Sequence, residues 1–108
     1  MPLKCINPAD IPVPETFSHV IVATGSRLVF IAGQVAEDSQ GDLIGPGDMT
    51  AQAHQVFANI GRALSAAGAQ PRQVTKLTIF VANYRREHLA MIEAGRVSLF
   101  GDHKPTDT

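Results

Sequence analysis

The middle of the chain carries apolar residues at intervals of three and four, which places them on one stripe of an α-helix. The members of this stripe are Met49, Ala53, Val56, Phe57, Ile60, Ala63, Leu64 and Ala67. Asp48 stands just before them and is a candidate N-cap, because its carboxylate can accept a backbone N–H bond. Gly68 suits the left-handed position after a helix, and Pro71 prevents continuation. The pattern predicts an amphipathic helix between these signals.

A second helix is predicted from about Glu87 to Phe100, with Gly101 ending it. Its shared face consists of Leu89, Ile92, Arg96, Leu99 and Phe100. Between the two helices, residues 74–83 are β-branched or aromatic and alternate in character, which predicts a strand. One face of that strand would carry Leu77, Ile79 and Val81, and the other Thr78, Phe80 and Ala82.

The first 48 residues read as strands and loops. The proline-rich segment Met1–Glu15 is expected to be extended and non-helical. His19–Ala23 and Arg27–Val35 are β-rich, and Thr24-Gly25-Ser26 between them predicts the turn of a β-hairpin. Within the second run, Leu28–Ala32 is apolar at every position, which predicts a strand covered on both faces. Residues 37–48 have loop chemistry, with a candidate short strand around residues 43–44.

The predicted order of elements is β-β-(β)-α-β-α, followed by a short closing segment. Two helices on one face of a small sheet leave the last helix without a strand to return to, whereas a βαβ crossover ends in a strand. Lys104–Thr108, "KPTDT", is therefore predicted to begin a further strand. The 108 residues predict a single α+β domain over residues 1–108, with additional C-terminal strands expected after Thr108.

Composition excludes several classes of function. The formal net charge of −1 argues against a nucleic-acid surface, and the longest apolar run is too short to cross a bilayer. The four histidines lack zinc-binding spacing, so no metal is expected. Cys5 is the single cysteine and is expected to be an unreactive thiol. With no apolar signal-peptide core at the N-terminus, a cytoplasmic location is expected.

Gly33 follows the apolar run directly, where glycine weakens a strand. A close approach by a ligand or another backbone would explain it, because glycine has no side chain to obstruct such an approach. A simple β-bulge explains it equally well. Both explanations stay open on the sequence alone.

Four motifs together resemble the reactive-intermediate-deaminase (Rid) family, also called YjgF-like or endoribonuclease L-PSP-like. They are "LVFIAGQV", "DMTAQAHQVFANI", "LSAAGA" and "VTKLTIFV", and the resemblance extends from Phe17 to Thr108. It implies a chorismate-mutase-like fold with a mixed β-sheet, two helices on one face, and a homotrimer that binds small metabolites in clefts between subunits. The best-known branch hydrolyses enamines and imines without a metal or cofactor.

The resemblance assigns ligand-binding positions residue by residue. Phe17 matches an aromatic residue before the first strand but lacks its phenolic hydroxyl. Ala32 stands where the family has a serine, and Gly33, whose backbone N–H meets a ligand oxygen, is retained. Pro105 of the family's "PxR(S/T)" motif is also retained, with Thr108 as its small hydroxyl residue.

Asp107 occupies the position of the family arginine that clamps a substrate carboxylate. The exchange removes that contact and adds a repulsion of about 4 kcal/mol for charges about 4 Å apart at an effective dielectric near 20. We therefore expect a divergent member that handles 2-imino acids poorly or not at all, with Asp107 as a candidate catalytic acid or base. Lys104 is a candidate substitute cation, and Asp107 could equally be an ordinary residue at the start of a strand.

Three classes of function stay open from the sequence. The first is a hydrolase or deaminase of imines, enamines or related small metabolites. The second is a trimer that binds a small metabolite without turnover, and the third is a structural trimer without a ligand. The water-positioning glutamate of the deaminating branch would lie beyond Thr108, so the sequence offers no candidate for it.

Overall fold

The computed structural model describes residues 3–108, so the first two residues of the predicted lead-in lie outside the described part. Its elements are two helices, four short strands and one 3₁₀ turn. In chain order they are β1 (Leu3–Ile6), β2 (Val20–Ala23), α1 (Met49–Ala66), the 3₁₀ turn (Pro71–Gln73), β3 (Lys76–Leu77), α2 (His88–Phe100) and β4 (Thr106–Asp107). The chain is a small α+β domain whose strands form two separate two-stranded sheets.

The capping signals predicted both ends of α1 and the C-terminal end of α2, and α2 starts at His88, one residue after the predicted Glu87. The Asp48 carboxylate accepts a 3.0 Å hydrogen bond from the backbone N–H of Ala51, which satisfies one free donor of the first turn of α1. Gly68 follows α1 with a φ of 73°, a left-handed conformation that favours glycine. Gly101 ends α2 with a φ of 57°, and its N–H bonds to the Val97 carbonyl.

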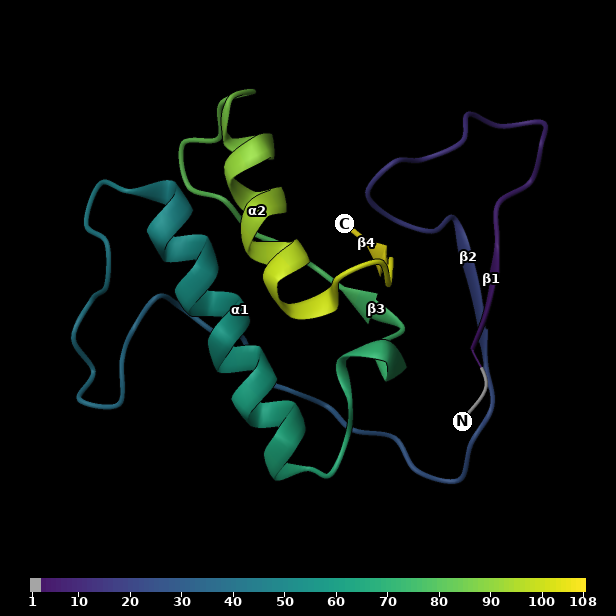
Figure 1. The fold of residues 1–108 in the computed structure, drawn as a ribbon, viewed down its shortest axis with the longest axis horizontal. Coiled ribbons are helices and arrows are strands. Elements are labelled where there is room, and N and C mark those ends of the chain that lie inside the picture. Colours follow the sequence, from purple (N-terminus) through teal and green to yellow (C-terminus); the bar gives the residue numbers. More distant parts are fainter. Residues whose placement is uncertain (1–2) are drawn as a thin grey trace.

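The core lies where α1 and α2 pack side by side (Figure 1). A Cβ atom added at Gly95 of α2 would lie 2.8 Å from the backbone carbon of Ala53, so the two helices approach closely at this point. Phe57 and Phe100 meet edge to face with ring centroids 6.0 Å apart. The buried apolar residues are Ala36, Ala53, Phe57, Leu64 and Phe100. Four of these five lie on the predicted helical stripes.

The strand after α2 forms as predicted and returns beside β3. β4 pairs with β3 in parallel, with Lys76 opposite Thr106 and Leu77 opposite Asp107. The ladder continues beyond the assigned strands, because the Ile79 N–H donates a 2.7 Å bond to the Thr108 carbonyl. β3 is shorter than the predicted strand 74–83, although the predicted alternation holds: Leu77, Ile79 and Val81 are half-buried, and Thr78, Phe80 and Ala82 are exposed.

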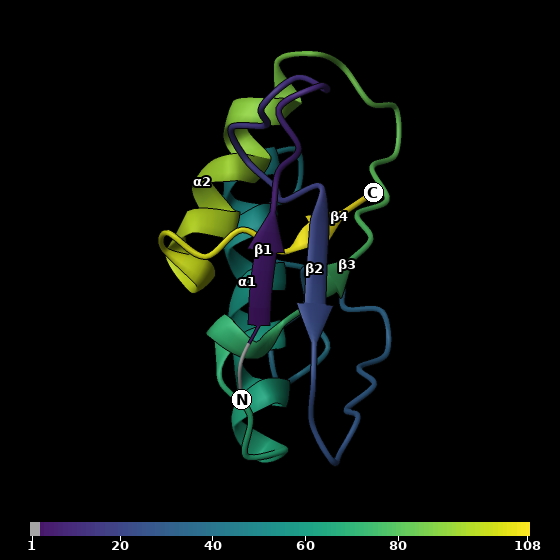
Figure 2. The ribbon, with the colours of Figure 1, turned by 90° about the vertical axis from the view of Figure 1, so that its right-hand side faces the viewer.

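The predicted hairpin between residues 19–23 and 27–35 does not form. β2 instead pairs antiparallel with β1, from Leu3 opposite Ala23 to Ile6 opposite Val20. Figure 2 shows these two strands side by side, in front of β3 and β4. The predicted lead-in therefore supplies the partner strand.

Residues 24–35 contain no assigned strand, and the expectation of a strand covered on both faces is wrong for this chain. Leu28 is 85% exposed and Phe30 is 88% exposed. The physical reason is that a covered strand needs a neighbour that accepts its backbone bonds. No other segment of residues 3–108 supplies such a neighbour.

The loop of residues 37–48 is largely as predicted. The short strand expected near Leu43 is reduced to a single antiparallel bridge with Glu37. Within residues 3–108, no helix is both long and apolar enough to cross a membrane.

Candidate functional site

Phe17 and Pro105 are brought into one region by hydrogen bonds from Ser18. The Ser18 hydroxyl donates to the Lys104 carbonyl at 2.6 Å, and its backbone N–H donates to the Pro105 carbonyl at 3.2 Å. Pro105 is fully buried, and Phe17 is half-buried with its ring edge-on to His19 at 5.4 Å. The aromatic position and the proline of the predicted site therefore lie together.

Asp107 lies on β4, beside β3, and Thr108 follows it directly. The Lys76 ammonium donates a 2.7 Å hydrogen bond to the Thr108 hydroxyl, which keeps its own O–H as a donor. The Asp107 side chain is half-buried, and Leu77 of β3 lies opposite it. The carboxylate is thus partly withdrawn from water.

The environment raises the pKa of the Asp107 carboxyl above its ordinary value of 3.8. Burial is the largest cause, because it disfavours the charged form. The positive charge of Arg96 opposes it, Glu93 adds to it by repulsion, and Lys76 lowers the pKa again. A carboxyl whose pKa moves toward neutrality is better suited to exchange protons with a ligand.

Arg96 is a buried charged residue that the sequence analysis did not single out as part of the site. It is only 2% exposed, although it is charged. Its Nε donates to Glu93 Oε1 at 2.8 Å, and its second terminal nitrogen bonds Glu93 Oε2 to complete a two-pronged ion pair. Its first terminal nitrogen donates to the His103 carbonyl at 3.2 Å. The signal in the sequence was a lone arginine on an otherwise apolar helix face.

Lys104, the predicted substitute cation, is not among the charges that act on Asp107. Its described role is through the backbone, since its carbonyl accepts the Ser18 bond. The cation that acts most strongly on Asp107 is Arg96.

Ala32 and Gly33 lie in the exposed segment between β2 and α1. A Cβ atom added at Gly33 would meet nothing within 4 Å, so no part of the described chain makes the close approach that its glycine would permit. The segment has no strand ladder in which a bulge could sit. Among residues 3–108, no hydrogen bond connects these two positions to β4.

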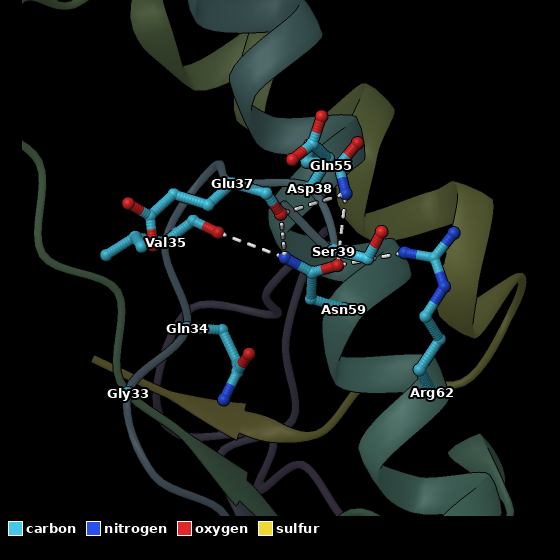
Figure 3. A pocket seen from close by; sticks show the side chains of 9 residues that line it. All are labelled: Gly33, Gln34, Val35, Glu37, Asp38, Ser39, Gln55, Asn59 and Arg62. Atoms are coloured by element: carbon cyan, nitrogen blue, oxygen red, sulfur yellow. Dashed lines mark hydrogen bonds between the residues drawn. The ribbon is translucent and has the colours of Figure 1, made fainter. Parts of the chain in front are cut away.

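An open pocket of about 650 Å³ lies between Gly33 and helix α1 (Figure 3). Asn59 organises it: its Nδ2 donates to the Val35 carbonyl at 3.1 Å and to the Glu37 carbonyl at 2.9 Å. Its Oδ1 accepts from Gln55 at 3.0 Å and from Arg62 at 2.8 Å. The amide is therefore fully bonded, and it fixes the loop that follows Gly33 against α1.

No three His, Cys, Asp or Glu side chains of residues 3–108 gather closely enough to hold an ion. His54, for example, is exposed, and its ring bonds the Thr50 carbonyl one helical turn away. The charged groups described near β4 are the Asp107 carboxylate, the Lys76 ammonium and the Arg96 guanidinium.

The sequence of the chain is similar to those of several known proteins. The chain is 37% identical over 83 residues to a RutC family protein from Synechocystis, covering 75% of this chain and 62% of that protein. It is 35% identical over 81 residues to the 2-iminobutanoate/2-iminopropanoate deaminase of Bos taurus, covering 74% of this chain and 58% of that protein. The matched region therefore spans about three fifths of each of these relatives.

A solved structure agrees along the whole chain. It is a Rid-family protein of unknown function from Yersinia pestis, with a TM-score of 0.91 and 35% identity, covering 100% of this chain and 84% of that one. The family model described as endoribonuclease L-PSP matches residues 9–108. On these likenesses, the chain belongs to the Rid family.

Proposed function

We propose that this chain is a divergent, deaminase-like Rid protein that hydrolyses small C=N compounds and selects ligands without a carboxylate. The observation that carries the proposal is Asp107, half-buried on β4, where the resemblance places a carboxylate-binding arginine. The bovine relative is named for 2-imino acid substrates, which carry that carboxylate. The charge at this position is reversed here, so the ligand is expected to be neutral or cationic.

The chemistry of imine hydrolysis fits a carboxyl group at this position. Water adds to the C=N carbon, a proton reaches the nitrogen, and ammonia leaves as the carbonyl forms. Each proton movement is served by an acid or base whose pKa lies closer to neutrality than that of a free carboxyl. Burial raises the pKa of Asp107 in that direction.

Discrimination against 2-imino acids follows from electrostatics. A carboxylate held about 4 Å from an ionised Asp107 is repelled by about 4 kcal/mol at an effective dielectric near 20. Lys76, whose ammonium donates to the Thr108 hydroxyl, is exposed, so solvent screens the attraction that it would offer a carboxylate. A neutral or cationic ligand avoids this penalty.

We also propose that the ligand site is completed by assembly into a homotrimer of chorismate-mutase-like subunits. Leu28, Phe30 and Phe80 are 85%, 88% and 93% exposed in the single chain. Burying these three exposed apolar side chains against another copy would stabilise the assembly, because removing each from water is worth about 1.5–3 kcal/mol of free energy. Light scattering coupled to size exclusion would report the mass, and a strictly monomeric mass would contradict this part of the proposal.

The test compares two imines that differ in the carboxylate. An amino-acid oxidase generates 2-iminopropionate, and an amine oxidase generates an imine from a primary amine that lacks the carboxylate. We expect the protein to leave the decay of 2-iminopropionate at the buffer rate and to accelerate that of the second imine. Asp107→Arg is expected to reverse the preference. Clear acceleration of 2-iminopropionate by the unaltered protein would refute the proposal.

A trimer that binds a metabolite without turnover is the second candidate, and one observation favours it. Asp107 is the single titratable group among the six predicted site residues, so the predicted set holds one acid or base rather than the pair that proton transfer in both directions would use. Such a protein would be stabilised thermally by a ligand without forming product. A melting temperature that rises with added ligand, while neither imine is consumed faster than in buffer, would favour this function over hydrolysis.

A further inference from the structure

An imidazole lies beside the aromatic residue of the candidate site. The ring of His19 meets that of Phe17 edge to face, with the two ring centroids 5.4 Å apart. Both side chains are half-buried, so each keeps a surface that a ligand can reach. Ser18, which stands between them in the chain, is buried and bonds the Lys104 and Pro105 carbonyls. The imidazole therefore belongs to the anchored segment that carries Phe17.

The surroundings of the ring determine which of its nitrogens carries the hydrogen. Nε2 of His19 lies 2.7 Å from the Pro12 carbonyl oxygen. A carbonyl oxygen only accepts, so Nε2 carries the hydrogen and donates it. In the neutral ring the other nitrogen, Nδ1, is then an acceptor with a lone pair. Among the hydrogen bonds and ion pairs of residues 3–108, none engages Nδ1.

This anchor suits a group that gains and loses a proton. A proton taken up at Nδ1 leaves the Nε2–H bond to Pro12 in place, so the ring keeps its orientation in both states. The backbone of His19 is fixed as well, because its N–H donates a 2.8 Å bond to Asn7 Oδ1. General acid–base catalysis needs a proton acceptor held within hydrogen-bond reach of the reacting atoms, and histidine fills this role most often.

We propose that His19 is a catalytic base and acid of the candidate site, and that its Nδ1 contacts the reacting end of a ligand seated on Phe17. The predicted site residues include one titratable group, Asp107, and His19 supplies a second from a different part of the chain. The inference rests on the proposed function for the reaction and on the assignment of Phe17 for the place of the ligand.

The proton transfers balance for an imine that enters protonated, which is a cationic form. Water adds its oxygen to the C=N carbon and gives one proton to His19 Nδ1, which leaves a neutral carbinolamine. The imidazolium then returns that proton to the nitrogen, and the C–N bond breaks with its electron pair going to nitrogen. Ammonia leaves, the hydroxyl proton passes to solvent water as the carbonyl forms, and the imidazole is neutral again.

The first test measures turnover of the imine that lacks a carboxylate. His19→Gln is the informative variant, because the amide of glutamine can donate to the Pro12 carbonyl but cannot take up a proton. We expect the acceleration over buffer to fall by about 10²–10⁴-fold, while circular dichroism and the melting temperature stay near those of the unaltered protein. His54→Gln is the matched control: His54 is exposed on α1 and its ring bonds the Thr50 carbonyl, so full activity is expected.

Chemical rescue separates a proton-transfer role from a structural one. His19→Ala removes both the anchor and the base, and it leaves space for a free imidazole. We expect imidazole in solution to restore part of the activity of His19→Ala and none of that of His19→Gln, where the amide fills the space. Equal activity of His19→Gln and the unaltered protein would overturn the inference.

The second test needs no turnover. It follows the ¹⁵N resonances of the His19 ring, assigned with His19→Gln, at a pH where the ring is neutral. We expect the hydrogen on Nε2, and we expect the Nδ1 resonance to shift when acetamidinium, a stable cation shaped like a protonated imine, is added. The ring resonances of His54 are expected to stay unchanged. A hydrogen on Nδ1, or an Nδ1 resonance that ignores the probe, would overturn the ligand contact.

The two measurements distinguish failure of this inference from failure of the proposed function. Turnover that survives in His19→Gln overturns the role of His19 and leaves the proposed function standing. A protein that accelerates neither imine refutes the proposed function, and the acid–base role of His19 with it. The ligand contact is then decided by acetamidinium alone, because its shift of Nδ1 does not depend on catalysis.

Discussion

The Ser18 hydroxyl donates a 2.6 Å hydrogen bond to the Lys104 carbonyl, across 86 positions of sequence. Ser18 is buried, and its backbone N–H bonds the neighbouring Pro105 carbonyl. The pair fixes the segment that carries Phe17 against the start of β4. It therefore connects the N-terminal part of the candidate site to its C-terminal part.

Ser18→Ala is expected to lower the free energy of unfolding by about 1–3 kcal/mol, because the partly buried Lys104 carbonyl loses the hydroxyl that donates to it. Urea denaturation followed by circular dichroism measures the change. Ser39→Ala is the matched control: Ser39 is exposed, and its replacement is expected to stay within about 0.5 kcal/mol. Equal effects of the two substitutions would show that the Ser18 bond does not stabilise the fold.

Gly95→Ala is expected to destabilise the contact between α1 and α2. The added methyl would lie 2.8 Å from the backbone of Ala53, and a helix backbone cannot give way as a side chain does. Overpacking of this kind costs about 1–3 kcal/mol, which exceeds the roughly 1 kcal/mol that alanine gains in helix propensity. Thermal unfolding reports the difference.

Gly61→Ala is the control for that prediction, because it is also a mid-helix glycine. Its added methyl would meet the Leu99 Cδ1 atom at 3.0 Å, which is the end of a flexible side chain. We expect a melting temperature near that of the unaltered protein or above it. A lower melting temperature for Gly61→Ala than for Gly95→Ala would contradict the close helix approach.

Asn59→Asp is expected to loosen the loop of residues 33–39. A carboxylate cannot donate to the Val35 and Glu37 carbonyls, so both of the Nδ2 bonds are lost. Hydrogen exchange should accelerate in this loop while α2 keeps its protection. Arg62→Ala removes one donor to the Asn59 oxygen and leaves the two carbonyl bonds, so it is expected to change exchange much less. Uniform acceleration over the whole chain in Asn59→Asp would argue against a local role.

Asp107→Asn is expected to stabilise the protein in a pH-dependent way. The folded-state pKa of Asp107 lies above the ordinary 3.8, so between the two values the folded state binds more protons than the unfolded state. Stability contributed by this group therefore falls as pH rises through that window. The free energy of unfolding of Asp107→Asn should exceed that of the unaltered protein above the window, and the difference should shrink below pH 3.8.

Urea titrations at a series of pH values measure this difference. A constant gap between the two proteins at every pH would show that the carboxyl's ionisation is not its source. A gap of opposite sign would show that Arg96 and Lys76 outweigh burial at Asp107.

The two helices could be predicted closely from the sequence, because their signals are local. Asp48 and Gly68 each act within one turn of a helix end, and neither depends on the rest of the fold. The return of the chain at Lys104–Thr108 was predictable for a different reason. A strand–helix–strand connection is almost always right-handed, so the segment after α2 has few positions in which it can pair beside β3.

Residues 27–35 could not be predicted in this way, because a strand is defined by its neighbour. The run Leu28–Ala32 has the composition of a buried strand, but the described chain offers it no partner. Arg96 illustrates a second limit. Its place on an apolar face was visible, and its ion pair with Glu93 lies within one helix, but its burial and its bond to the His103 carbonyl depend on how the chain turns after α2.

The exposed segment of residues 24–35, between β2 and α1, makes the protein prone to aggregation. "LVFIA" is apolar, uncharged and rich in β-formers, and it presents donors and acceptors along its length without a ladder. Such a stretch is a template for fibril-like stacking between identical chains. During synthesis it also leaves the ribosome before α1, α2 and β4 exist. Shelf life should therefore fall steeply with protein concentration wherever another copy does not cover this segment.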